Sequence, residues 1–376
     1  MWPLKPLICN LLIIAALVCI ASTSNAMAQG PYAYITNSNN NTVIVIDTQT
    51  NTVTATIPVG NRPSGVAVSP DGSKIYVANS DSNTVSVIDA ATNSVTATVP
   101  VGKFPWRVAV NPAGTKIYVS NFDSDTVAVI DAATNNVTAT VPVGKWPHGI
   151  AASGTKIYVG SVYGENVLVI DAATNNVIAN ISVGGPAIAL AVNPAGTKIY
   201  VGLGGLCVVV IDAASNKVIA AVPVPSEVSP GGCYTGGGIA VNAMGTKIYA
   251  AAGNNISVID STTNNVTDII PMGQIPWGVA VTPDGLKIYV VSSGDNVSVI
   301  DAAINTVTAN ITVGNGFASL GQFIRPAMPT VTPAMSPIVS PQSSVSPTPV
   351  PFAGMEGIGA IVLGAAFYKL AGRKRN

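Results

Sequence analysis

The chain has 376 residues, of which only 9% are charged, and its formal net charge is zero. Such a chain is not expected to bind nucleic acid, because that requires a concentration of basic residues on one face. The scarcity of charge agrees with a location at the cell surface.

The first segment, residues 1–28, is predicted to be a secretory signal peptide. Lys5 provides a short positive start, "LICNLLIIAALVCIA" is an apolar core, and "SNAMA" offers small residues for cleavage after Ala26 or Ala28. An uncleaved membrane anchor is the alternative.

A repeat occupies the next part of the chain and sets its architecture. An Ile-Asp pair recurs at spacings of 42, 42, 40, 41, 48 and 41 residues, at Asp47, Asp89, Asp131, Asp171, Asp212, Asp260 and Asp301. The same copies carry Tyr34, Tyr76, Tyr118, Tyr158, Tyr200, Tyr249 and Tyr289. There are therefore seven units.

Each unit contains four short apolar runs with turn residues between them, as in residues 61–102. Val, Ile, Thr and Tyr alternate with smaller or polar residues at period two, which is typical of half-buried strands. Pro-Asp-Gly and Asp-Ala-Ala-Thr-Asn favour tight reversals. Each unit is predicted to be a four-stranded antiparallel meander.

A seven-bladed β-propeller over residues 29–325 is the predicted fold, because four strands cannot bury both faces alone. The chain begins its repeats without a first strand, at "PYAYITNSNNNTVIVID", and residues 314–324 supply only a first strand. That last strand, near Leu320, is expected to pair with the strand around Ile35 and close the ring. A linear solenoid is the alternative, and it would not explain the matching half-units.

The repeat text "KIYVANS…NTVSVIDAATNSVTATVPVG…RPSGVAVSPDG" resembles the YVTN-family β-propeller repeat of archaeal cell-surface and surface-layer proteins. The resemblance covers roughly residues 31–325. It implies a fold and an extracellular location, and it implies no reaction, since fold does not fix function.

The residues of the usual catalytic and metal sites are scarce. The repeated Asp residues end the third strand of each unit and are expected to accept backbone N–H bonds in the following turn. One histidine, His148, cannot build a His-based metal centre or a two-His acid/base pair. The sequence therefore predicts no metal, no cofactor and no enzyme.

Large aromatic and basic side chains gather before the first strand of several units, on one predicted rim of the propeller. The predicted ligand-binding residues are Arg62, Phe104, Trp106, Arg107, Trp146, His148 and Trp277, with Ile275 and Phe317 at equivalent places. Exposed Trp and Arg at a concave mouth suit contact with a ligand or a partner, including stacking on sugars. Packing of each Trp between adjacent blades is the alternative.

Two cysteines remain beyond the signal segment, and Cys207 and Cys233 are predicted to form a disulfide, with two free thiols as the alternative. Seven Asn-x-Ser/Thr sequons are candidate glycosylation sites, at Asn40, Asn136, Asn180, Asn255, Asn265, Asn296 and Asn310. In a repeat rich in Asn and Thr, such sequons also arise by chance.

The C-terminal part changes composition twice. Residues 326–352 are rich in Pro, Ser and Thr and are predicted to form an extended stalk. Residues 353–376 combine an apolar run with the basic cluster Arg373-Lys374-Arg375, which predicts a membrane anchor helix or a sorting signal that is exchanged for a lipid.

The function expected from these features is a non-enzymatic structural or adhesive role at the cell surface, with cell-envelope proteins or glycans and the membrane as partners. A receptor for a small ligand or polysaccharide at the Trp-lined rim is the second possibility. A lyase or hydrolase is the third, and the single histidine counts against it.

Overall fold

The structure is a computed structural model that describes residues 30–204, 207–225, 237–294, 296–314, 316, 321 and 323–325. All of them belong to one unit, residues 1–331. The predicted signal peptide, stalk and C-terminal anchor lie outside the described residues. Within the described ranges, no helix is long and apolar enough to cross a membrane.

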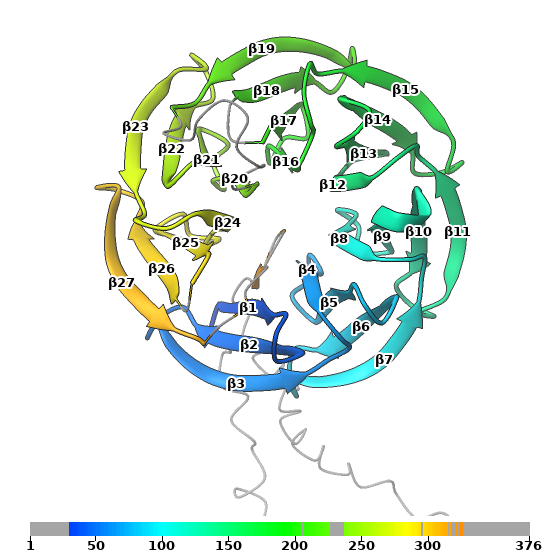
Figure 1. Cartoon of the computed structure of the whole chain (residues 1–376), viewed down its shortest axis with the longest axis horizontal. Helices are drawn as coiled ribbons and strands as arrows, with labels where there is room; N and C mark the ends of the chain where they lie inside the picture. The colour runs from blue at the N-terminus through cyan, green and yellow to red at the C-terminus, as the bar shows by residue number, and fades with distance from the viewer. Residues whose placement is uncertain are drawn as a thin grey trace, which may run out of the picture. The chain divides into compact units, whose positions relative to one another are not determined.

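Seven four-stranded antiparallel sheets stand around a central channel (Figure 1), so the predicted seven-bladed, all-β propeller is confirmed. Blade I consists of β28 (Ile324–Arg325), β1 (Tyr32–Asn37), β2 (Thr42–Asp47) and β3 (Thr52–Pro58). Blade II consists of β4 (Pro63–Val68), β5 (Lys74–Asn79), β6 (Thr84–Asp89) and β7 (Ser94–Pro100). Blade III consists of β8 (Pro105–Val110), β9 (Lys116–Asn121), β10 (Thr126–Asp131) and β11 (Val137–Pro142).

Blades IV to VII repeat this order. Blade IV has β12 (Pro147–Ser153), β13 (Lys156–Ser161), β14 (Asn166–Asp171) and β15 (Val177–Ser182), and blade V has β16 (Ala189–Val192), β17 (Lys198–Gly202), β18 (Cys207–Asp212) and β19 (Lys217–Pro223). Blade VI has β20 (Ile239–Val241), β21 (Lys247–Ala252), β22 (Asn255–Asp260) and β23 (Val266–Pro271), and blade VII has β24 (Pro276–Val281), β25 (Lys287–Ser292), β26 (Asn296–Asp301) and β27 (Thr306–Thr312). One short 3-10 helix, η1 (Phe122–Ser124), follows β9.

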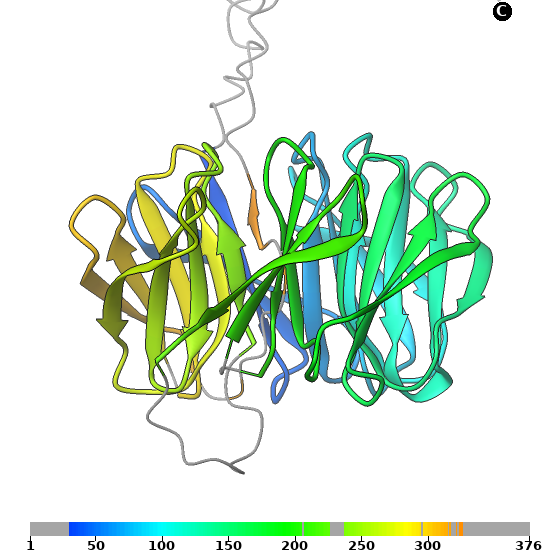
Figure 2. The same ribbon diagram turned by 90° about the horizontal axis from the view of Figure 1, so that it is seen from above.

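Burial follows the position of each strand in its blade. The first strand faces the channel and the fourth forms the outer wall (Figures 1 and 2). The second and third strands, such as β5 and β6, are buried almost throughout, because neighbouring blades cover both of their faces. The fourth strand, such as β7, is mostly exposed and carries Thr at alternate positions. The repeated tyrosines of the second strands are fully buried between blades.

The repeated Asp residues hold the turns between the third and fourth strands, as predicted. The Oδ1 atom of Asp131 accepts hydrogen bonds from the backbone N–H groups of Ala133 and Thr134, at 3.1 and 2.8 Å. Thr134 also donates its hydroxyl to the same oxygen at 2.9 Å. These bonds lower the pKa of the Asp131 carboxyl below its usual value. An Asp that recurs in this way serves its blade.

The ring closes between the two ends of the repeat region, as the half-units predicted. β28 pairs antiparallel with β1 and places Ile324 opposite Ala33. The N–H of Tyr34 also donates to the carbonyl of Phe323 at 2.8 Å. The closing strand therefore begins at Ile324, later than the expected segment centred on Leu320, and Leu320 itself lies outside the described residues. Phe323 and Ile324 are buried in one apolar cluster with Tyr289 of blade VII.

A lysine at the start of each complete second strand joins its blade to the next. The Nζ atoms donate to backbone carbonyls that follow the third strand of that next blade, in the pairs Lys74–Ala132, Lys116–Ala172, Lys156–Ala213, Lys198–Ser261, Lys247–Ala302 and Lys287–Thr48. Blade I has Tyr32 in place of this lysine. The guanidinium of Arg325 lies 5.0 Å from the centre of the Tyr32 ring and donates to the carbonyl of Ala90 at 3.1 Å. Arg325 thus takes the place of the seventh lysine.

Candidate functional site

Three residues that precede a proline are held in an unusual backbone conformation at one rim of the ring. Arg62, Phe104 and Trp146 have φ angles of 53°, 53° and 55°, in the left-handed region that non-glycine residues rarely adopt. Each begins the approach to a first strand, and we call these segments the interblade turns. Non-glycine residues in this region cost energy and gather at functional sites.

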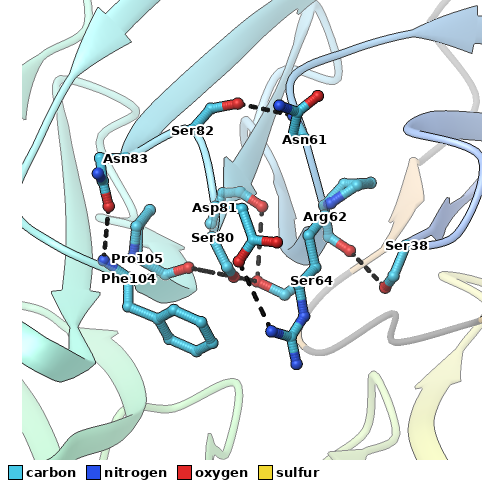
Figure 3. A network of polar contacts seen from close by, with 12 residues as sticks. Ser38, Asn61, Arg62, Ser64, Ser80, Asp81, Ser82, Asn83, Phe104 and Pro105 are labelled. Atoms are coloured by element: carbon cyan, nitrogen blue, oxygen red, sulfur yellow. Dashed lines mark hydrogen bonds and ion pairs between the residues drawn. The ribbon is translucent and has the colours of Figure 1, made fainter.

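A side chain of the preceding blade stabilises each of these turns. The backbone N–H groups of Arg62, Phe104 and Trp146 donate to the side-chain oxygens of Asn41, Asn83 and Asp125, at 2.8, 2.9 and 3.0 Å. Figure 3 shows the bond between Asn83 and Phe104 and the ion pair between Arg62 and Asp81, whose charged atoms are 3.6 Å apart. Backbone strain is therefore used to fix three large side chains at the rim.

Six rings from blades III and IV form a continuous series of contacts, which we call the aromatic arc: Phe104, Trp106, Phe122, Trp146, His148 and Tyr163. Phe104 stacks on Trp106 with 5.5 Å between ring centres, and Trp106 lies 5.6 Å from His148. Phe122 stacks on Trp146 at 5.4 Å. Arg62 lies over Phe104 at 5.1 Å and extends the arc into blade II.

The arc is partly open to solvent. Trp146 is 45% exposed and Tyr163 is 68% exposed, whereas Phe104, Trp106 and His148 are partly buried. Sequence reasoning predicted four of the six rings and missed Phe122 and Tyr163. Both lie in loops between a second and a third strand, on the same rim, so an aromatic residue in that loop was the available signal.

Arg107 is buried instead of exposed, which corrects the expectation for this residue. It is 5% exposed, and one guanidinium nitrogen lies 3.5 Å from the carbonyl oxygen of Gly237, which precedes β20. Strands β8 and β20 lie on opposite sides of the channel (Figure 1), so the side chain extends across it. Its Nε atom has no hydrogen-bond partner in the described part of the chain. Burial lowers the pKa of Arg107 to about 9. The group still carries its charge at neutral pH, and within the described ranges no carboxylate pairs with it.

His148 is held as a neutral imidazole beside this charge. Its Nδ1 atom lies 2.7 Å from the carbonyl oxygen of Ile188 in the next blade. A carbonyl oxygen only accepts, so Nδ1 carries the proton and Nε2 keeps its lone pair. Desolvation lowers the pKa of His148 to about 3, and the charge of Arg107 adds to the effect. A neutral base and a buried cation thus lie close enough to interact electrostatically.

Trp277 does not join this group. It lies in β24 of blade VII, partly buried, and makes no ring contact within the described residues. The backbone carbonyl oxygen of Trp277 lies close to Gly238 of blade VI. A Cβ atom at position 238 would be only 2.9 Å from this oxygen, so the two backbones approach closely there. Ile275 lies before the same strand and is also partly buried, and Phe317 is outside the described residues.

A cavity of about 740 Å³ occupies the channel on the other side of Arg107. First strands of blades III to VII line it with alkyl residues, among them Val108, Ile150, Leu190, Ile239 and Val279. Polar residues such as Ser153, Asn193 and Thr197 line its other end. It reaches the turns that end the first and third strands, at the opposite rim. Arg107 therefore separates the aromatic arc from this cavity.

Other candidate groups are less informative. Within the described residues, no cluster of three or more His, Cys, Asp or Glu is placed to hold a metal ion. Cys207 begins β18 with a partly buried thiol, and Cys233 lies outside the described residues, so the disulfide stays a prediction. Of the sequon residues, Asn255 is partly buried and the others are exposed, at Asn40, Asn136, Asn180, Asn265, Asn296 and Asn310.

Comparison with known proteins gives one family match over part of the chain. Residues 24–146 match the family model "Lactonase, 7-bladed beta-propeller", which covers less than half of the chain. The matched segment contains Phe104, Trp106 and Arg107. No curated protein shows a significant match.

Solved structures share the fold at low sequence identity. One is the Kuenenia stuttgartiensis hydrazine synthase, with a TM-score of 0.62 and 23% identity, covering 68% of this chain and 88% of that one. Another is a functionally unknown protein from Desulfotomaculum acetoxidans, with a TM-score of 0.67, 15% identity and coverage of 77% and 99%. A third is the dihydro-heme d1 dehydrogenase NirN, with a TM-score of 0.54, 15% identity and coverage of 78% and 75%.

These findings correct the functional expectation. The prediction of a non-enzymatic structural or adhesive role is wrong, because residues 24–146 match a family model described as a lactonase. The chain is a seven-bladed β-propeller that is similar over residues 24–146 to the Lactonase propellers.

Proposed function

We propose that this protein is a hydrolase that opens a lactone, a cyclic ester, between Arg107 and His148. The observation that carries the proposal is the buried guanidinium of Arg107, which no carboxylate of the described residues pairs with, within electrostatic range of the neutral imidazole of His148. The match of residues 24–146 to the Lactonase family model supports this choice of reaction.

Arg107 has the role of stabilising negative charge. In lactone hydrolysis, a tetrahedral intermediate places a full negative charge on the former carbonyl oxygen. A buried cation that no carboxylate of the described residues neutralises interacts with such a charge far more strongly than it would in water. The indole Nε1–H of Trp106 is also buried without a hydrogen-bond partner among the described residues and offers a second donor nearby.

His148 has the role of general base. Its Nε2 lone pair takes a proton from water as the water oxygen bonds to the carbonyl carbon. The intermediate then collapses, the ring C–O bond breaks, and the departing alkoxide takes the proton back from His148. One water is consumed and one hydroxy acid is formed. Desolvation first, and then the charge of Arg107, lower the pKa of His148 and make it a weak base at first. The developing oxyanion offsets the contribution of Arg107.

The aromatic arc has the role of holding the substrate ring. Exposed and half-exposed rings offer apolar contact area that loses little conformational entropy on binding. Trp146 and Phe104 are fixed by strained interblade turns, so their positions are set before a substrate arrives.

The experiment is a hydrolysis assay on the purified full chain with a panel of γ- and δ-lactones, followed by proton release. R107Q should lower kcat/KM by about 10²–10³-fold, as for loss of an oxyanion donor. H148Q should lower it by about 10²–10⁴-fold, as for loss of a general base. K217Q, on the outer strand β19, is the control and should match the parent. The proposal is wrong if no lactone opens faster than in buffer, or if the R107Q and H148Q variants keep the parent rate.

We also propose that the enzyme is exported and attached to the membrane at its C-terminus, with repeats of YVTN type. The sequence of residues 1–28, the Pro-rich residues 326–352 and the basic end of residues 353–376 support this. Mass spectrometry of the mature termini and cell fractionation would test it. A chain that keeps residues 1–28 and stays in the cytosol would contradict it.

A further inference from the structure

The cavity beyond Arg107 has an apolar band between the two rims and, at Arg107, a charge that no carboxylate of the described residues pairs with. Its wall between the two rims is built from the small and branched residues of first strands, such as Ala109, Ala152, Leu190 and Val192. Its volume, about 740 Å³, lies within the range of sites that enclose small organic ligands. Ala109, Ala152 and Val192 are only partly buried, so these side chains border the open space.

The other charged residues of the wall are already engaged. Lys156 donates from Nζ to the carbonyl of Ala213 at 2.6 Å and to the side chain of Asn216 at 3.1 Å. Asp212 accepts from the backbone and the hydroxyl of Ser215, at 2.8 and 2.6 Å. Arg107 has only its 3.5 Å contact with the Gly237 carbonyl in the described part of the chain. A ligand that fills the cavity therefore meets a cation at one end, alkyl groups between the two rims, and polar turn residues at the other end.

We propose that this cavity binds an alkyl chain whose carboxyl or ester group lies at Arg107, so that the substrate is an alkyl-substituted lactone and the product is a hydroxy fatty acid. The assignment of the reaction rests on the proposed function, and the binding of the chain does not. A guanidinium matches the two oxygens of a carboxylate with its planar fork. The alkyl wall offers few donors to a sugar or a phosphate group, which need several hydrogen bonds each.

Chain length is the property that tests the site. We would titrate the full-length protein with butanoate, hexanoate, octanoate and decanoate by calorimetry, with octan-1-ol as the ligand that lacks a carboxylate. Burial of each methylene should tighten binding by roughly fourfold until the cavity is full. Octan-1-ol should bind far more weakly than octanoate.

Variants of the wall and of the charge locate the binding. A152F narrows the cavity and should abolish the gain from hexanoate to decanoate, whereas A152S keeps the size and should retain it. R107M should remove the preference for octanoate over octan-1-ol, and K217M, which removes a charge from the exposed outer wall, should not. Thermal unfolding of each variant shows whether it is folded, and V192F replaces A152F if that variant is not.

The outcomes separate this inference from the proposed reaction. Carboxylates that bind with the expected chain-length series, in a protein that opens no lactone, support the chain site and reject the reaction. Hydrolysis of unsubstituted lactones, with affinities that do not depend on chain length, rejects the chain site and supports the reaction. Equal binding of octanoate by R107M and the parent also overturns the inference.

Discussion

Two arginines are buried in this propeller, and their surroundings differ. Arg325 closes the ring: it donates to the Ala90 carbonyl at 3.1 Å and lies over the Tyr32 ring. Arg107 crosses the channel and has one 3.5 Å contact in the described residues. A buried charge costs free energy unless it is paired or hydrogen-bonded. Arg325 has the environment of a structural residue, and Arg107 has that of a group kept for a ligand.

The two rims of the ring also differ in whether their residues are structural or belong to the candidate site. At the rim of the third-to-fourth strand turns, one arrangement recurs, with Asp131 and its equivalents accepting backbone N–H bonds. At the rim of the interblade turns, blades III and IV carry the aromatic arc, and the described residues of the other blades form no equivalent series of ring contacts. Repeated residues build the ring, and residues that break the repeat assemble the candidate site.

The largest effect on stability is expected at Arg325. R325M should lower the free energy of unfolding by about 3 kcal/mol, because it leaves the Ala90 carbonyl without its donor and removes the contact with Tyr32. R325K should recover part of this, since lysine makes the same bond in the other blades. Urea unfolding would measure both. If R325M is as stable as the parent, Arg325 does not replace the seventh lysine.

Replacing Arg107 should stabilise the protein, whereas replacing Arg325 should destabilise it. R107M should raise the free energy of unfolding by about 2 kcal/mol, because an unpaired buried cation is replaced by an apolar side chain of similar length. Urea unfolding of R107M and R325M, measured side by side, compares the two changes in the free energy of unfolding. Under conditions where both variants are folded, only R107M should lose activity. A destabilised R107M would show that Arg107 is satisfied within the protein, and the comparison would fail.

The fold followed from the sequence because its signals are local and repeated. Val and Thr alternation predicted the strands, and the Asp residues predicted the turns. The half-units predicted the closure, yet Arg325 was missed because its partner, Ala90, is 235 residues away. Arg107 was placed wrongly because the register shifts between Pro105 and Arg107 in the pairing of β8 with β9. A bulge of this kind changes where a side chain points, and alternation alone does not reveal it.

His148 should make the protein less stable in acid. Its pKa is about 3 in the folded protein and close to 6.5 in the unfolded chain. Above pH 6.5 both states are neutral at this residue, and as pH falls toward 3 the unfolded chain binds the proton first, so stability is lost. The loss is on the order of 2 kcal/mol for a partly exposed ring.

H148Q should flatten this part of the stability profile. Urea unfolding of the parent and H148Q would be measured at several pH values between about 4 and 7, a range that includes the ordinary His pKa of ~6.5. A152S is the control: it neither adds nor removes a titratable group and should follow the parent. The activity of the parent should stay near its plateau down to about pH 4, because the free base persists to low pH. A fall of kcat/KM centred near the ordinary His pKa would contradict the buried, neutral imidazole.

The smallest effect is expected at a single interblade lysine. K198M removes the 2.8 Å bond from Nζ to the Ser261 carbonyl and should cost about 1 kcal/mol, as for one partly buried hydrogen bond to a charged donor. The cost should be below that of R325M, because Lys198 joins two blades that the chain already connects, whereas Arg325 joins the two ends of the ring. Urea unfolding of K198M, R325M and the double variant tests this. If K198M and R325M lower the free energy of unfolding equally, then Arg325 stabilises the fold no more than a single interblade lysine does. The contact that closes the ring would then be no more important to stability than any other contact between neighbouring blades.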